Sequence, residues 1–64
     1  MSNRLAQFKK LEDALDEACA KTIFLETVAE QDNDESLWKF TEEVYKRLTY
    51  IRAAVAEKIT ALGQ

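Results

Sequence analysis

The chain has 64 residues and a formal net charge of −3, and it contains one cysteine, one glycine, no proline and no histidine. This length allows one domain with a small core. Without histidine, the Ser-His-Asp and Cys-His catalytic arrangements and the Cys/His zinc sites are excluded within one chain, and Cys19 alone cannot form an intramolecular disulfide. We therefore expect no enzymatic activity, no catalytic residue, no metal and no cofactor.

Sequence features that direct a chain to a membrane or to export are also missing. Residues 1–10 lack the apolar segment of a signal peptide, and no apolar run approaches the roughly 18 to 20 residues of a membrane span. A lone cysteine fits a reducing compartment. We expect a cytoplasmic protein with no membrane partner.

The first predicted element is a helix over residues 3–30, capped by Ser2 or Asn3. Its apolar and small residues recur at steps of three and four, the spacing that keeps side chains on one stripe of a helix. In heptad notation, Phe8, Leu15, Thr22 and Ala29 take position a, and Leu11, Ala18 and Leu25 take position d.

A polar turn over residues 31–33 follows, with Asp32 and Glu35 at the spacing of a capping box. The second predicted helix covers residues 34–62, with Gly63 as a left-handed C-terminal residue. Its a positions are Thr41, Leu48, Val55 and Leu62, and its d positions are Leu37, Val44 and Ile51.

The two heptad patterns match when the second helix folds back on the first, because paired positions have numbers that sum to 62 or 63. The pairs are Phe8–Val55, Leu11–Ile51, Leu15–Leu48, Ala18–Val44, Thr22–Thr41 and Leu25–Leu37. The sequence therefore predicts an all-α fold, an antiparallel hairpin of two long helices forming a single domain over residues 1–64.

Apolar residues beside the a and d positions predict a dimer. A lone hairpin needs only a narrow seam, and the second helix carries apolar groups on both sides of it. Two hairpins packed as a homodimeric four-helix bundle would cover them. The predicted dimer interface consists of Ala14, Cys19, Val28, Tyr45, Ala54 and Ile59.

Charge is distributed unevenly along the predicted hairpin. Residues 12–43 carry a net charge of −9, whereas residues 1–11 and 44–64 together carry +6. The fold brings both basic segments to the open end and leaves the acidic residues near the turn. Two copies in antiparallel orientation would place opposite charges side by side, so the charges favour an antiparallel dimer.

A few apolar residues lie off the predicted seam and are candidates for binding another protein. Ile23 and Phe24 take positions b and c, and Tyr50 takes position c. With Trp38 and Phe40 they form the predicted partner-binding set, since exposed aromatic residues dominate binding hot spots. Two alternatives remain: these residues complete the dimer interface, or Ile23 and Phe24 fold inward to fill the small Thr22–Thr41 layer.

The pattern favours a small protein-binding module, an adaptor, antagonist or inhibitor of an unidentified protein partner, as encoded by many phages and plasmids. In length and architecture the hairpin resembles the repressor-of-primer type, whose dimers contact RNA, and this resemblance implies an RNA- or DNA-binding alternative. The acidic net charge disfavours nucleic acid as a partner. A further alternative is a DNA mimic that uses the carboxylates of Glu12, Asp13, Asp16 and Glu17.

Overall fold

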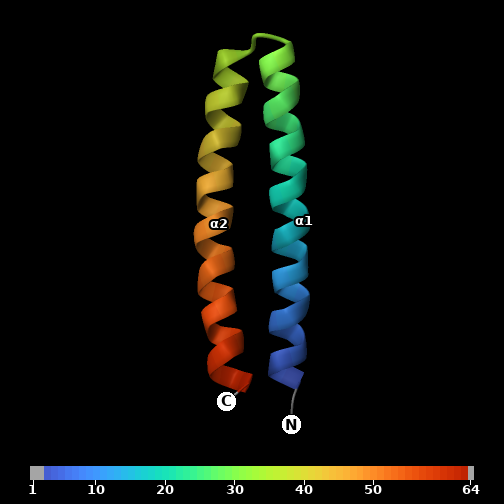
Figure 1. Cartoon of the computed structure of the whole chain (residues 1–64), viewed down its shortest axis with the longest axis vertical. Coiled ribbons are helices and arrows are strands. Elements are labelled where there is room, and N and C mark those ends of the chain that lie inside the picture. The colour runs from blue at the N-terminus through green and yellow to red at the C-terminus, as the bar shows by residue number, and fades with distance from the viewer. Residues whose placement is uncertain (1–2, 64) are drawn as a thin grey trace.

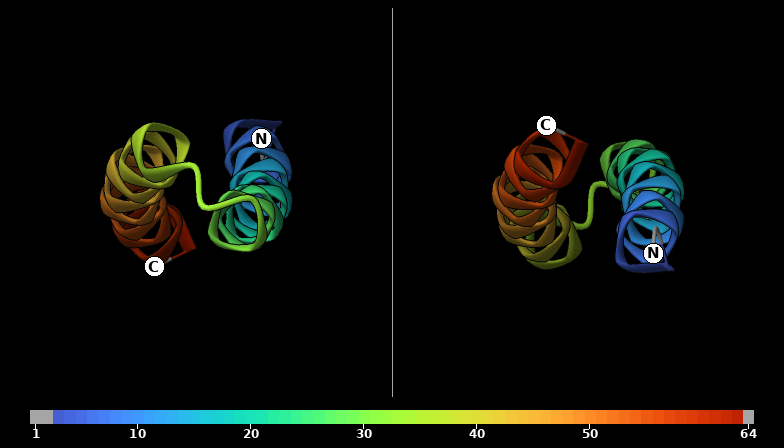
Figure 2. Two further views of the ribbon diagram at one scale, coloured as in Figure 1. Left: turned by 90° about the horizontal axis from the view of Figure 1, so that it is seen from above. Right: turned by 90° about the horizontal axis from the view of Figure 1, so that it is seen from below.

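The computed structural model describes residues 3–63, which form two helices, α1 (Asn3–Gln31) and α2 (Glu35–Gly63). The helices lie side by side in antiparallel orientation, so that both chain ends are at the end opposite the turn (Figure 1). The molecule measures 50 × 14 × 11 Å. Viewed along its length, the two helices are inclined to each other rather than strictly parallel (Figure 2). The predicted all-helical hairpin is confirmed.

The turn is built from three polar residues, and Asn33 is the one that reverses the chain. Asn33 has a left-handed backbone with φ of 54°, a conformation that asparagine tolerates better than most residues. The N–H of Asp34 donates to the carbonyl of Ala29 at 2.9 Å, and that of Asn33 to the carbonyl of Glu30 at 3.2 Å. These two bonds form a Schellman motif, which satisfies the last carbonyl groups of α1.

Asp34 then starts the second helix as its N-cap. Its Oδ1 accepts a hydrogen bond from the N–H of Leu37 at 3.0 Å, and its carbonyl accepts one from the N–H of Trp38. The predicted capping box of Asp32 and Glu35 is therefore wrong, because the N-cap is Asp34, two residues after Asp32, and Glu35 is the first residue of α2.

Predictions for the outer helix ends have mixed outcomes. Gly63 is the last residue of α2 and does not have a positive φ, so the predicted left-handed C-terminal cap is wrong. Asn3 is the first residue of α1, whereas Ser2 lies outside the described residues.

The core is built from a positions, although Phe8 and Leu48 at this position are half-buried and Leu62 is 43% exposed. The buried residues among those described are Leu15, Thr22, Ala29, Thr41 and Val55, all at position a. The threonine hydroxyls can be buried because each donates to a backbone carbonyl one turn back: Thr22 to Ala18 at 2.7 Å and Thr41 to Trp38 at 2.8 Å.

Position d does not share this burial, contrary to the predicted layers. Leu11, Leu25 and Ile51 remain 44 to 49% exposed. Two helices touch along one line, so each buries a narrow strip and leaves its flanks accessible to solvent. Here that line follows position a, with d on one side and e on the other. Ile23 and Phe24 are also exposed and do not fill the Thr22–Thr41 layer.

Candidate protein-binding surfaces

One side of the seam is bridged by polar contacts between the helices. We call it the Trp38 flank: it comprises the half-buried e positions Cys19, Glu26, Trp38, Tyr45, Arg52 and Ile59, with the neighbouring b positions of α1. The indole N–H of Trp38 donates to Glu30 Oε1 at 3.2 Å. Arg52 forms a hydrogen-bonded ion pair with Asp16. Both contacts run from an e position of α2 to a b position of α1.

The ion pair on the Trp38 flank affects the titration of its arginine. The hydrogen bond to Asp16, reinforced by the charge of that carboxylate, raises the pKa of Arg52 above its ordinary value. The charge of Glu12 acts in the same direction. Arg52 thus stays charged at every physiological pH.

The opposite side of the seam has a different composition. We call it the Phe40 flank: it comprises the d and g positions, with Leu11, Ala14, Leu25, Val28, Phe40, Ile51 and Ala54 among its members. In an antiparallel pair the d positions of both helices lie on the same side of the a row, opposite the e positions. Within the two helices, no d or g position holds Asp or Glu.

Half of the eight exposed large hydrophobic residues among residues 3–63 lie on the Phe40 flank. Phe40 is 65% exposed, and Leu11, Leu25 and Ile51 are each nearly half exposed. Among residues 3–63, no hydrogen bond or ion pair between the helices crosses this side. The result is a surface along both helices on which apolar side chains are uncovered in the single hairpin, interspersed with the exposed basic residues Arg4, Lys21, Arg47 and Lys58 at d and g positions.

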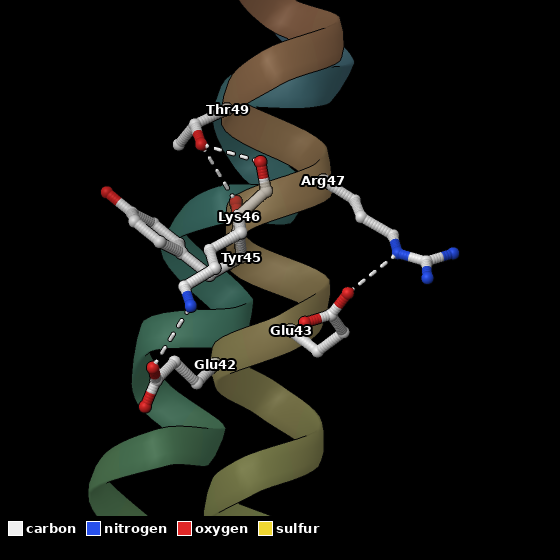
Figure 3. Close-up of polar contacts among 6 residues, drawn as sticks. All are labelled: Glu42, Glu43, Tyr45, Lys46, Arg47 and Thr49. Atoms are coloured by element: carbon white, nitrogen blue, oxygen red, sulfur yellow. Dashed lines mark hydrogen bonds and ion pairs between the residues drawn. The ribbon is translucent and has the colours of Figure 1, made fainter.

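Side chains of α2 show directly that the two flanks face apart. Figure 3 shows Tyr45, at position e, and Arg47, at position g, projecting to opposite sides of α2. On the Tyr45 side, Lys46 pairs with Glu42 at 3.5 Å; on the other, Arg47 pairs with Glu43 at 3.1 Å. These pairs join residues of one helix four positions apart, so they leave the apolar residues of either flank uncovered.

The structure distributes the predicted partner-binding residues over several surfaces. Trp38 lies on the Trp38 flank, and Ile23 is at a b position beside it. Phe40 lies on the Phe40 flank. Phe24 and Tyr50, at c positions on the backs of the two helices, are 68% and 78% exposed. The five residues therefore do not share one patch.

The predicted dimer-interface residues also divide into two groups. Ala14, Val28 and Ala54 are g residues on the Phe40 flank, whereas Cys19, Tyr45 and Ile59 are e residues on the Trp38 flank. Sequence reasoning missed Leu11, Leu25 and Ile51 as surface residues because it assigned them to the core. The small a residues Thr22, Ala29 and Thr41 were the available signal, since small side chains mark the line where two helices approach closely.

Other chemical features of the described residues are sparse. Residues 3–63 contain no cluster of three or more His, Cys, Asp or Glu side chains that could hold a metal ion. Cys19 is a half-buried free thiol. An open depression of about 400 Å³ lies beside the turn, lined by Ala29, Glu30, Asn33, Asp34, Glu35 and Trp38. Neither α1 nor α2 has an apolar stretch long enough to cross a membrane.

Comparison with known proteins leaves the surfaces to be interpreted from their own chemistry. No protein family, curated protein or solved structure matches the chain.

Proposed function

We propose that this chain is a non-enzymatic protein-binding module that acts in the cytoplasm as a homodimeric four-helix bundle. The observation that supports it is the unusual exposure of apolar side chains in the folded hairpin. Among residues 3–63, eight large hydrophobic residues remain exposed: Leu11, Ile23, Phe24, Leu25, Phe40, Tyr50, Ile51 and Leu62. Extended apolar surfaces of this kind mark sites where proteins associate.

The surface proposed to bind a different protein lies outside the proposed dimer interface. Phe24 and Tyr50 are on the backs of the helices, and Ile23 is one position from Phe24 along α1. Pairing of hairpins along one flank leaves these residues accessible. A partner with an apolar patch could bury the rings, and the chain would then act as an adaptor, antagonist or inhibitor of that partner.

A pair of substitutions that introduce charges at Ile23 and Phe24 tests the proposed partner site. The double variant Ile23→Lys/Phe24→Glu should keep the helical circular dichroism signal, because both side chains are exposed. If either is a hot spot, affinity for a protein partner should fall about 30-fold or more. The matched control is Ala20→Lys/Thr27→Glu, which makes the same change of charge at exposed f positions of the same helix.

The partner itself can be found by photocrosslinking. A photoreactive residue at position 24 should crosslink a host protein that position 20 does not capture, and purified partner then gives the affinities. A folded Ile23→Lys/Phe24→Glu protein that binds this partner as tightly as the control would contradict the proposed site.

Nucleic acid binding is the second candidate, and the basic open end of the hairpin favours it. Arg4, Lys9, Lys10 and Lys58 lie in the parts of α1 and α2 that are far from the turn in sequence. Binding to a random-sequence RNA hairpin and a DNA duplex, followed between 50 and 200 mM salt, would test it, because neutralised phosphates give a steep loss of affinity with salt. The DNA-mimic alternative is weakened by two ion pairs: Asp16 contacts Arg52, and Glu17 contacts Lys21 at 3.2 Å.

A further inference from the structure

We infer that a second copy of this chain covers the Phe40 flank and lies antiparallel to the first, turn end against open end. This inference rests on the proposed homodimer, keeps the antiparallel direction that the charge distribution favours, and adds the face that is buried. It also identifies what remains free in the dimer: the Trp38 flank and the backs of both helices.

The exposed area of the hairpin matches the size of a protein interface. Its solvent-accessible surface is 5125 Å², whereas a compact monomer of 7.4 kDa exposes about 4,200 Å². The excess is about 900 Å², and a stable interface buries about 800 Å² on each partner. The difference is therefore about what one additional contact face would bury.

The two flanks are not equally suited to be that face. On the Trp38 flank, Trp38 and Arg52 contact carboxylates of α1, so burial there would dehydrate two polar contacts and the charge of Glu26. The Phe40 flank has no polar contact between the helices to disrupt. Burial there removes mostly apolar side chains from water, which is the favourable term in association.

Large and small side chains alternate on the Phe40 flank in a way that suits self-packing. Phe40 and Ile51 lie on α2, and Ala14 and Ala18 on α1. When two hairpins lie level and antiparallel, the level of Phe40 along the bundle axis is within a helical turn of the level of Leu11 of the other copy. Small residues at neighbouring positions provide room for the ring, as in packing of knobs into holes.

The direction follows from the distribution of charge along the 50 Å hairpin. The turn half, residues 12–43, has a net charge of −9, and the open half has +6. Antiparallel copies place the turn half of one beside the open half of the other. A parallel dimer would place like charges together along its whole length, so electrostatics select the antiparallel form.

Three glutamate substitutions distinguish the faces. Phe40→Glu introduces a charge on the Phe40 flank without disturbing the hairpin, because the ring is mostly exposed. Thr49→Glu does so beside the Trp38 flank, and Tyr50→Glu on the back of α2. In analytical ultracentrifugation at micromolar concentration, we expect the wild type and the two controls to be dimers. Phe40→Glu should dissociate about 30-fold or more readily.

A distance measurement tests the direction. In a Cys19→Ser background, Gln31→Cys carries one spin label next to the turn of each copy. An antiparallel dimer separates the two labels by nearly the 50 Å length of the hairpin. A parallel dimer brings them within about 20 Å, two helix diameters. Pulsed electron paramagnetic resonance resolves these two cases.

These experiments distinguish a wrong buried face or a wrong direction from the absence of a dimer. If Thr49→Glu disrupts the dimer and Phe40→Glu leaves it intact, the Phe40 flank is not the buried face. If the two spin labels lie close together, the dimer is parallel. In both cases the dimer itself is retained. A wild-type monomer at micromolar concentration would overturn the inference together with the dimer in the proposed function. Partner capture at position 24 would still test the binding module separately.

Discussion

The Trp38 flank and the Phe40 flank lie on either side of the same seam, yet only the first is bridged within the chain. On the Trp38 flank, the indole of Trp38 and the guanidinium of Arg52 reach across to carboxylates of α1. On the Phe40 flank, apolar side chains such as Leu25 and Ile51 stay half exposed. Long polar side chains can satisfy one another across two helices while still hydrated, but apolar ones need another surface.

The comparison shows how one heptad pattern can encode two kinds of contact. Residues at a hold the hairpin together, and residues at d and g are available for association. Substitutions at a positions should therefore affect folding, and substitutions at d and g positions should affect association.

The seam and the Phe40 flank should differ most in a pair of leucine truncations. Leu15 is buried at position a, so Leu15→Ala should lower the free energy of unfolding by about 2 to 5 kcal/mol. Leu11→Ala removes the same atoms from a half-exposed d position, and at concentrations that favour monomer it should cost less than half as much. Urea denaturation followed by circular dichroism measures both, and equal losses would contradict the assignment of the seam to position a.

Concentration should affect stability only while the Phe40 flank can associate. For a folded dimer in equilibrium with unfolded chains, each tenfold rise in concentration adds about 1.4 kcal/mol of stability. The melting temperature of the wild type should therefore rise with concentration, and that of Phe40→Glu should not. Melting curves over a hundredfold range test this, and equal slopes for the two proteins would disconnect the flank from assembly.

The turn keeps the two flanks in register, and its cap should have a smaller effect. Asp34→Ala removes the side-chain oxygen that accepts from the N–H of Leu37, at a cost of about 1 kcal/mol. Asp32→Ala is the matched control, because Asp34, not Asp32, is the N-cap of α2. Thermal melts of both variants under the same conditions measure the difference. A larger loss for Asp32→Ala would restore the capping box that the sequence pattern indicated.

The smallest effect is expected from the ion pair on the Trp38 flank. Both Arg52 and Asp16 are well exposed, so solvent screens their attraction. In a double-variant cycle with Arg52→Gln and Asp16→Asn, the coupling should be smaller than the loss from Asp34→Ala and should vanish at 1 M salt. A coupling that persists at high salt would show that this flank contributes more to the hairpin than its exposure indicates.

The hairpin architecture could be predicted from the amino-acid sequence alone. Heptad steps of three and four, the absence of proline, and the polar segment around Asp32 and Asn33 are local features that leave one arrangement of two long helices. The antiparallel packing of the two helices also followed from the sequence, because the polar turn leaves the second heptad pattern to fold back on the first.

Which side of the a row is bridged by the other helix could be seen only from the packing of α1 against α2. Positions d and e both flank a, and each row carries large apolar side chains as well as charged ones, so the heptad pattern could not choose between them. The inclination of the helices and the reach of Trp38 and Arg52 across the seam settled it. Leu11, Leu25 and Ile51 were therefore assigned to the core from sequence, whereas packing in three dimensions places them on the surface.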